Sequence, residues 1–288
     1  TTVGRWATER GRKVESLRRV FSAGAPVSPN VLRWMRDTMG EGGEMFTPYG
    51  ATESLPVASI ESREVLEETA DKCDAGAGTC VGRRFSGIEW KVIAIDDGPL
   101  ASIQDVRELP QGQIGELMVT GDVVTQQYVT RTDQNLLHKV QDGDRIWHRT
   151  GDVGYLDEQG RFWCCGRKSH RVRTAGGQLF TEPCEAIFNT HPHVHRSALV
   201  GIGELGSQQP VLIAELWPEH TPHDSLSRQQ LIAQLRGIGK SHALTKSIEH
   251  ILLYPKRLPT DIRHNAKIFR EQLGPWAAKQ LMQTSRRS

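Results

Sequence analysis

The stretch MFTPYGATES, residues 45–54, holds four groups that could together bind a phosphorylated ligand with a flat base. Tyr49 offers a ring on which a base can stack, and Gly50 lets the backbone approach a ligand closely. The hydroxyl of Thr52 can bond a phosphate oxygen, and the carboxylate of Glu53 can hold Mg²⁺. Taken alone, so short a match favours an ordinary polar turn.

A second polar segment, WHRTGDVGYLD, covers residues 147–157. Its Asp152 could accept hydrogen bonds from both hydroxyls of a ribose, because a carboxylate offers two acceptor oxygens. The letters TGD are also typical of a turn, so we predict a polar turn between two strands here.

Basic residues gather at two places further along the chain. Residues 166–185 carry four of them beside a Gly-Gly turn: Arg167, Lys168, Arg171 and Arg173. Residues 261–273 carry Arg263, His264 and Lys267. Such clusters are usually solvated faces, although a polyphosphate needs the same groups.

Two other patterns give weaker signals. The glycines of GAGTCVG, residues 76–82, have the wrong spacing for a dinucleotide fingerprint and lack the lysine of a P-loop, so we predict a turn before a strand. His191, His193 and His195 alternate and could hold a metal ion from one face of an extended segment. Pro192 interrupts them, so a solvated loop is favoured.

The composition of the 288 residues is typical of a globular protein. Hydrophobic residues at 37% and charged residues at 24% are enough for a packed core. The formal net charge is +2 and the basic residues are spread along the chain, which argues against a nucleic-acid partner. There is no apolar run of about 18 residues and no signal-peptide pattern. Because the five cysteines are an odd number, we expect reduced thiols and a cytoplasmic protein. Assembly with other enzymes of a pathway is left open.

The first 60 residues have the pattern of α/β structure. A short strand is expected within residues 17–26, ending in the small-residue turn SAGAP. Ser28 and Pro29 predict a helix start, with a capping hydroxyl followed by proline at the first helical position. A strand at residues 44–47 then leads into the tyrosine segment. In such sheets ligands bind beyond the carboxyl ends of strands.

Two further regions follow. Residues 81–166 predict a β-rich subdomain, with strands at 88–96, 114–121 and 161–166. Residues 167–288 predict a small α+β domain, with helices at 182–191, 226–239 and 268–282 and strands at 197–203, 211–217 and 248–255. The expected fold is thus α/β plus α+β, with one domain at 1–166, of which 1–80 is the α/β part, and a second at 167–288.

The order of these motifs resembles the acyl-adenylate-forming, or AMP-binding, superfamily. SAGAP, YGATE, RTGD, GRK with its glycine turn and a lysine near the C-terminus follow one another as in acyl-CoA synthetases, peptide-synthetase adenylation domains and luciferases. The resemblance covers essentially all 288 residues. It implies that residues 1–166 are the C-terminal part of a large adenylating domain and that the small domain rotates about a hinge near residues 166–169.

The resemblance also implies roles for residues near the N-terminus of the chain. The segment lining the adenine pocket is Ala23, Gly24, Ala25 and Pro26. Tyr49, followed by Gly50, is similar to the ring that stacks on adenine. Thr52 resembles the hydroxyl on the α-phosphate, and Glu53 resembles the Mg²⁺ ligand.

Three later residues acquire roles in the same way. Asp152 resembles the carboxylate that binds the ribose diol, and Arg167 resembles a second contact to ribose or phosphate. Lys267 resembles the lysine that bridges the substrate carboxylate and the α-phosphate of ATP. His170 and His264 are candidates for a general base, without geometry to support either.

The departures from the superfamily narrow the resemblance. Ser169 stands where the hinge usually has Asp or Lys, and RHNAK replaces the usual Gly-Lys loop. PYGATE, GRKSHRV, TEPCEAIFNTHP and DIRHNAKIFRE are similar to the olefin β-lactone synthetases, which act on long-chain 2-alkyl-3-hydroxyacids. The implied activity is ATP-dependent adenylation followed by lactone closure in olefin biosynthesis. The alternatives are a long-chain fatty acid–CoA ligase and an inactive remnant. The superfamily's phosphate loop has no match before YGATE, so we expect a piece of a longer enzyme that is inactive alone.

Overall fold

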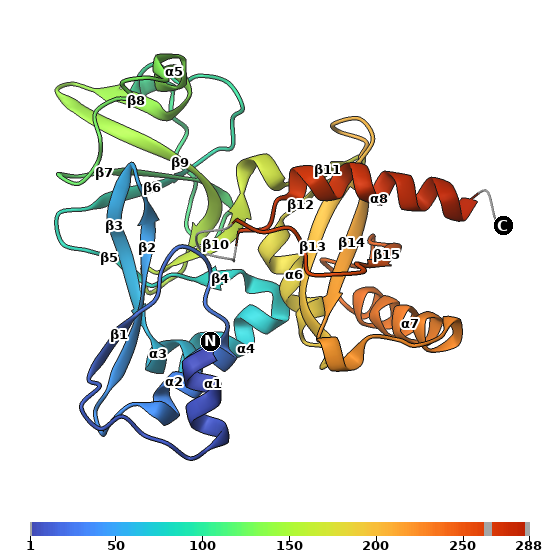
Figure 1. Cartoon of the computed structure of the whole chain (residues 1–288). Coiled ribbons are helices and arrows are strands. Elements are labelled where there is room, and N and C mark those ends of the chain that lie inside the picture. Colours follow the sequence, from blue (N-terminus) through green and yellow to red (C-terminus); the bar gives the residue numbers. More distant parts are fainter. Residues whose placement is uncertain (1, 262–266, 286–288) are drawn as a thin grey trace. The chain divides into compact units, whose positions relative to one another are not determined.

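The structure is a computed structural model of the chain, and it describes residues 2–261 and 267–285 (Figure 1). Contacts between residues divide the chain into two compact units. The first unit comprises Thr1–Lys72 and Thr79–Lys168, and the second comprises Cys73–Gly78 and Ser169–Ser288. The domain boundary between residues 166 and 167 stays a prediction. The α/β plus α+β fold class is confirmed by the solved structures described below.

The first unit opens with a strand–helix–strand repeat. β1 (Arg19–Phe21) and β2 (Glu44–Ala51) run parallel, with α2 (Pro29–Thr38) between them in sequence. Ser28 is the N-cap residue of α2, but the predicted capping hydrogen bond from its hydroxyl is not made. An additional helix that the sequence did not predict, α1 (Thr2–Glu9), packs on α2.

β2 turns back through a tight hairpin. It pairs antiparallel with β3 (Ser54–Glu61), and β5 (Arg83–Arg84) completes the order β1-β2-β3-β5. The predicted turn at the tyrosine segment is therefore wrong for Tyr49 and Gly50, which belong to β2; only Thr52 and Glu53 form the turn. Short helical turns then lead away from the sheet: α3 (Ser62–Glu64), η1 (Val65–Thr69) and α4 (Ala70–Lys72).

The second sheet of this unit is antiparallel. Its strands, in spatial order, are β4 (Thr79–Cys80), β10 (Phe162–Arg167), β9 (Arg145–Leu156), β7 (Gly115–Thr120) and β6 (Glu89–Ile93), with β8 (Lys139–Asp142) also on β9. Short helical turns connect them: η3 (Ile103–Asp105), η4 (Thr132–Gln134) and α5 (Asn135–His138).

β9 runs without interruption through residues 149–152, so the predicted turn there is wrong. The polar residues of this segment suggested a turn, because the sequence does not show that they are buried. Arg149, for example, is fully buried beside β7. Gly151 has a φ of 73°, a conformation that glycine tolerates, and the pairing with β7 shifts between Glu116 and Met118.

Both faces of β7 are covered, because its side chains alternate between two clusters. Leu117 and Val119 pack with Val57 of β3 and with Phe162. Met118 packs on the other side with Val140 and Trp147: this cluster also holds Ile93. The first cluster joins the two sheets of the unit and so fixes the strands that carry the site.

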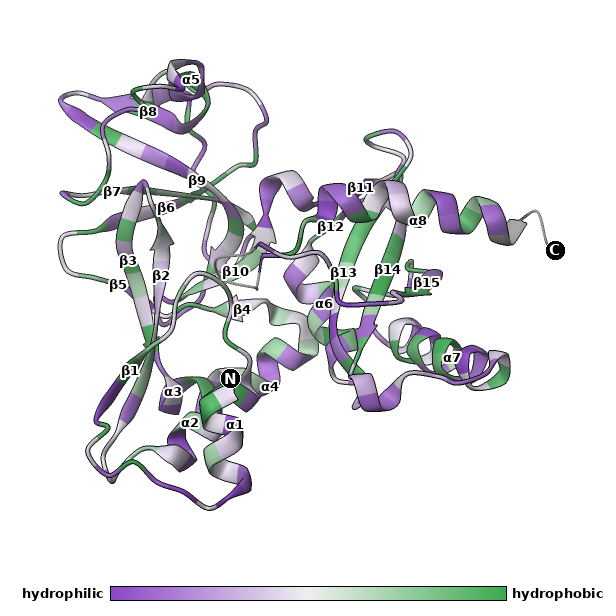
Figure 2. Cartoon of the chain, in the orientation of Figure 1, coloured by the Kyte–Doolittle hydropathy of each residue, from purple (hydrophilic) through white to green (hydrophobic). Residues whose placement is uncertain are grey.

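The second unit is a three-stranded sheet between helices. β13 (Val194–Ile202), β14 (Gln209–Leu216) and β15 (His250–Leu253) form the sheet, and Figure 2 shows β13 and β14 largely in the hydrophobic colour. The remaining elements are β11 (Val172–Thr174), β12 (Gly177–Leu179), α6 (Thr181–Asn189), α7 (Ser225–Ser241), α8 (Arg270–Ser285) and the turns η2 (Cys73–Ala77), η5 (Lys168–His170) and η6 (Pro218–His220).

Alternation along β13 explains this layering. Leu199 packs with Phe188 of α6 and Leu235 of α7 on one face, whereas Ala198 packs with Leu273 of α8 on the other. α7 begins at Ser225, and the carboxylate of the preceding Asp224 caps it by accepting the amide hydrogen of Ser227 at 2.8 Å. No helix among the described residues is both long and apolar enough to span a membrane.

Two glycines test this packing. A methyl group on Gly154 of β9 would lie 2.0 Å from the carbonyl oxygen of Trp163, whereas one on exposed Gly237 of α7 meets nothing within 4 Å. Gly154→Ala should therefore lower the free energy of unfolding by about 1–3 kcal/mol. Gly237→Ala should raise it by about 0.5–1 kcal/mol, because alanine favours the helix. Urea unfolding measures both; a neutral Gly154→Ala would contradict the close strand approach.

Candidate functional site

Three predicted residues from three strands meet at one carboxylate. The hydroxyl of Tyr49 on β2 donates a hydrogen bond to Oδ2 of Asp152 on β9, at 2.6 Å. Nη1 of Arg167 on β10 lies 3.2 Å from Oδ1 of the same carboxylate. Asp152 and Arg167 are paired in the strand register, and Arg167 also donates to the carbonyl of Thr150 at 2.7 Å. Tyr49 and Asp152 are 103 residues apart in sequence, so only the fold brings them together.

The carboxylate of Asp152 favours a neutral phenol at Tyr49 and a charged guanidinium at Arg167. Burial, together with the negative charge of Asp152, raises the pKa of Tyr49 well above its ordinary value, so the phenol stays neutral and donates. Asp152 also raises the pKa of Arg167. The ring of Tyr49 is half-buried and lies 6.0 Å from that of Phe162, between centroids. Its role as a stacking platform stays a prediction.

The loop of Ala23, Gly24, Ala25 and Pro26 follows directly after β1. Because β1 and β2 are parallel, this loop and the tyrosine end of β2 leave the sheet at the same edge. Gly24 has a φ of 99°, which favours glycine at this bend. Three of the four residues are exposed, as a ligand-facing loop requires.

Glu53 lies in the β2–β3 turn beside exposed Thr52, and a tyrosine that the sequence did not single out holds it. The hydroxyl of Tyr128 donates to Oε1 of Glu53 at 2.9 Å, and the amide of Thr125 donates to the Glu53 carbonyl at 2.8 Å. Nζ of Lys139 donates to Oγ1 of Thr125 at 2.9 Å and lies 5.5 Å from the centre of the Tyr128 ring. The run GELMVTGDVVTQQY, residues 115–128, ends in this tyrosine. It also resembles a strand segment of the acyl-adenylate-forming superfamily, which was the signal that the sequence offered.

Burial and hydrogen bonds set the ionisation of this cluster. Burial raises the pKa of Glu53, but the hydrogen bond from Tyr128 and nearby positive charge outweigh it, so the net pKa is lowered. Burial, reinforced by Glu53, raises the pKa of Tyr128 to about 12. Burial lowers the pKa of Lys139 to about 8, and burial with the charge of Lys139 lowers that of His148 to about 4.

One carboxylate is a suitable protein contribution to a Mg²⁺ site of the nucleotide type. Mg²⁺ in such sites usually takes one or two carboxylates together with substrate phosphates and water. Glu53 is ionised and only half-buried, which fits that pattern. Among the described residues no group of three or more His, Cys, Asp or Glu side chains could hold a metal ion by itself.

The histidine trio is not the solvated loop that the sequence favoured. His191 is buried and lies 3.2 Å from Oε1 of Gln234, while Nδ1 of His195 on β13 lies 2.9 Å from Oε1 of Glu215. The ring of His193 stacks on that of His220 with centroids 4.1 Å apart. The trio thus belongs to the packing of the second unit.

Lys267 lies in the second unit, whereas the residues around Asp152 and Glu53 lie in the first. Its side chain is exposed, and its amide donates to Oδ1 of Asp261 at 2.9 Å. Arg263 and His264 lie outside the described residues. His170 is half-buried, and its role as a base stays a prediction.

Some of the basic residues that follow residue 166 make contacts within the protein. Nζ of Lys168 lies 3.0 Å from Oε2 of Glu116 and donates to the carbonyl of Asp96 at 2.9 Å. The same Glu116 oxygen lies 2.7 Å from Nη2 of Arg149, and both of these side chains are fully buried. Arg171 is also buried. Lys168 and Arg171 are therefore not a solvated face.

A family model matches the part of the chain that carries Tyr49, Glu53 and Tyr128. Residues 4–129 match the model of the AMP-binding enzymes. Over these residues the chain is similar to the AMP-binding enzymes. Its resemblance to olefin β-lactone synthetases is also confirmed: it is 45% identical over 275 residues to the olefin beta-lactone synthetase of Xanthomonas campestris, and 45% identical over 278 residues to that of Stenotrophomonas maltophilia.

These alignments cover 94% and 95% of this chain but 49% of each relative, so the chain spans about half the length of the curated relatives it matches. Among solved structures, the O-succinylbenzoate coenzyme A synthetase MenE of Bacillus subtilis, in complex with ATP and magnesium ion, matches with a TM-score of 0.70 and 24% identity, over 95% of this chain and 50% of that one. The amide bond synthetase McbA of Marinactinospora thermotolerans matches with a TM-score of 0.69 and 23% identity, over 94% of this chain and 49% of that one. These likenesses establish the fold.

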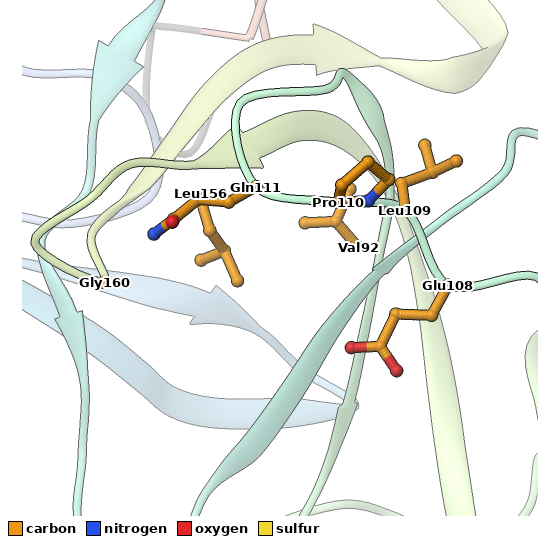
Figure 3. Close-up of a pocket in the computed structure, with 7 residues that line it drawn as sticks. All are labelled: Val92, Glu108, Leu109, Pro110, Gln111, Leu156 and Gly160. Carbon is orange, nitrogen blue, oxygen red and sulfur yellow. The ribbon is translucent and has the colours of Figure 1, made fainter.

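A surface cavity elsewhere in the first unit is separate from the candidate site. It has a volume of about 220 Å³ and is lined by Val92, Glu108, Leu109, Pro110, Gln111, Leu156 and Gly160 (Figure 3). None of the predicted site residues lines it. Glu108 on its rim is paired with Lys91.

His148 provides a pH test of the site's packing. Its pKa is lowered from 6.5 to about 4, so the unfolded chain binds a proton that the folded chain does not as pH falls through this range. Its contribution to stability is present above pH 6.5 and is lost towards pH 4, amounting to about 3 kcal/mol. In urea unfolding, His148→Asn should flatten this loss, whereas the exposed His223→Asn should not. Equal pH slopes for His148→Asn and the wild type would contradict the burial.

Proposed function

We propose that this chain forms part of an ATP-dependent ligase that converts a carboxylic acid into an acyl-AMP. The observation that supports it most is the meeting of Tyr49, Asp152 and Arg167 beside the turn that carries Glu53. The similarity of residues 4–129 to the AMP-binding enzymes supports a nucleotide as the ligand of this arrangement. ATP and Mg²⁺ are the proposed cofactors.

We propose that the carboxylate of Asp152 binds the ribose while it keeps Tyr49 and Arg167 among its partners. A carboxylate offers two acceptor oxygens, which suit the two hydroxyls of a ribose. Arg167 places a positive charge beside this carboxylate. An ionised acceptor bonds a hydroxyl more strongly than a neutral one.

The chemistry at phosphorus is a displacement. The carboxylate of the substrate attacks the α-phosphorus of ATP, a P–O bond forms, and the bond to pyrophosphate breaks. Thr52 contributes a hydroxyl to the α-phosphate, and Lys267 contributes positive charge against the transferring group. Mg²⁺, when bound at Glu53, offsets negative charge on the phosphates.

We assign lactone closure as the second step, because two relatives that are 45% identical to this chain are olefin beta-lactone synthetases. The proposed substrate is a long-chain 2-alkyl-3-hydroxyacid. Its 3-hydroxyl oxygen attacks the acyl carbon, AMP leaves with the electron pair of the acyl–oxygen bond, and the hydroxyl proton passes to a base. His170 and His264 remain the candidate bases.

A coenzyme A ligase is the second candidate. The medium-chain acyl-CoA ligase ACSF2 of Mus musculus is 29% identical over 187 residues, which is 65% of this chain and 27% of that protein. Such an enzyme shares the adenylation step and differs in the acceptor, a thiol in place of the substrate's own hydroxyl. An inactive remnant is the third reading.

The acceptor decides between the two enzymes. With ATP, Mg²⁺ and a long-chain 2-alkyl-3-hydroxyacid, the lactone reading predicts equal amounts of β-lactone and AMP without coenzyme A. Mass spectrometry of the products measures both. A 2-alkyl acid lacking the 3-hydroxyl is the matched control and should give no lactone. Strict dependence on coenzyme A would contradict lactone closure.

Asp152→Asn tests the ribose contact. It keeps the size of the side chain but removes its charge, so AMP binding should weaken by about 10- to 100-fold, as for a lost hydrogen bond to a charged group. Titration calorimetry with AMP measures this. Asp144→Asn, at an exposed position in the β8–β9 turn, should leave the affinity unchanged. Equal affinity of Asp152→Asn and wild type would remove Asp152 from the nucleotide site.

A further inference from the structure

The segment that carries Lys267 is closed at its base by pairing between its two ends. Thr260 and Ile268 form an antiparallel bridge. The amide of Asp261 donates to the carbonyl of Lys267 at 3.0 Å, and the amide of Lys267 donates back to the Asp261 carboxylate at 2.9 Å. Where Lys267 lies in the second unit therefore depends on how the two stems of this segment are fixed.

A buried carboxylate holds the stem that enters the segment. The amide of Leu258 donates to Oε2 of Glu215 on β14, at 2.8 Å. Glu215 is 3% exposed and also receives Nε of Arg196 at 2.7 Å, with Nδ1 of His195 at 2.9 Å from its other oxygen. Burial opposes ionisation, but these partners outweigh it and lower the pKa of Glu215. Leu258 itself is buried in the core under α8, so this stem has both a polar and an apolar anchor.

A second buried carboxylate holds the stem that leaves the segment. Arg270 is the first residue of α8, three positions after Lys267, and its Nη2 lies 2.6 and 2.7 Å from the two oxygens of Glu185 on α6. Glu185 also accepts the amide hydrogen of Leu199 on β13, at 2.7 Å. Nε of Arg270 is buried and has no hydrogen-bond partner, so Glu185 is the group that compensates the guanidinium. Removing one partner of such a buried ion pair lowers the free energy of unfolding by far more than the intact pair contributes to it.

We propose that Glu185 and Glu215 are positioning residues for Lys267, each fixing one stem of the lysine segment to the sheet of the second unit. The carboxylates do not touch the reacting atoms. They act by limiting where the exposed ammonium can lie, and small displacements of a charged group from a transferring phosphate cost rate. This inference rests on the proposed role of Lys267 in adenylation.

Amide hydrogen exchange on the full chain tests the positioning itself. Glu185→Gln removes the charge and keeps the volume, and exchange in residues 258–269 should become about tenfold faster while β13 and β14 exchange as in the wild type. Glu271→Gln makes the same chemical change one residue after Arg270, at an exposed position, and should leave all rates unchanged. Wild-type exchange in Glu185→Gln would overturn the proposal.

A paired variant separates positioning from simple stability. Glu185→Gln with Arg270→Met removes the guanidinium that the single change leaves uncompensated, so the second unit should regain its stability. Exchange in residues 258–269 should nevertheless stay fast. Recovery of slow exchange in the paired variant would mean that the ion pair contributes only stability, and it would overturn the proposal even where the single variant does not fold.

A kinetic cycle connects the segment to the reaction. In the enzyme active in adenylation, Glu185→Gln should lower kcat for AMP formation about tenfold with little change in the KM for ATP. The same change should have no further effect when Lys267 is already alanine. An equal loss in both backgrounds would overturn the proposal. If Lys267→Ala does not alter AMP formation, the proposed function of Lys267 fails, while faster exchange in Glu185→Gln would still support the positioning.

Discussion

The site depends on one carboxylate, Asp152, which receives the hydroxyl of Tyr49 and the guanidinium of Arg167. Tyr49 belongs to one sheet of the first unit, and the other two residues belong to the second sheet. The apolar cluster around Phe162 presses these sheets together, so packing sets the distances and the charge sets the orientation. Without this carboxylate, the guanidinium of Arg167 would lose its counter-charge and the phenol of Tyr49 would lose its hydrogen-bond acceptor. The side chains where the two sheets meet would then no longer be held in one arrangement.

Buried ion pairs lie near both groups of candidate site residues. Arg149 lies on the strand that carries Asp152 and pairs with Glu116 of β7, and both side chains are fully buried. Arg270 at the start of α8 pairs with the buried Glu185 of α6. Such pairs are not efficient sources of stability, because desolvation opposes their attraction. They do fix geometry, since an ionised oxygen buried among donors tolerates few arrangements. The first pair lies on and beside the strand of Asp152 and the second lies beside the segment of Lys267, which agrees with a role in orientation.

The sequence predicted the order of elements better than it predicted which of them are turns. Both polar segments were expected as turns, but Tyr49 and Asp152 lie in strands, because burial against neighbouring strands overrides the local preference of polar and small residues. Motif order pointed to Tyr49, Asp152 and Arg167, which the fold brings together, even where the predicted local structure was wrong. Tyr128 and Lys139 were missed, since the hydrogen bond from Tyr128 to Glu53 joins residues 75 apart and no spacing reports such a contact.

The central claim is that the substrate carboxylate is activated as an acyl-AMP, and the fate of its oxygen tests this most directly. With a carboxylic acid labelled with ¹⁸O in both carboxyl oxygens, attack on the α-phosphorus places one labelled oxygen between carbon and phosphorus. Departure of AMP then carries that oxygen away, so mass spectrometry should find one ¹⁸O in the AMP phosphate. Label in inorganic phosphate with formation of ADP, or AMP without label, would contradict the account.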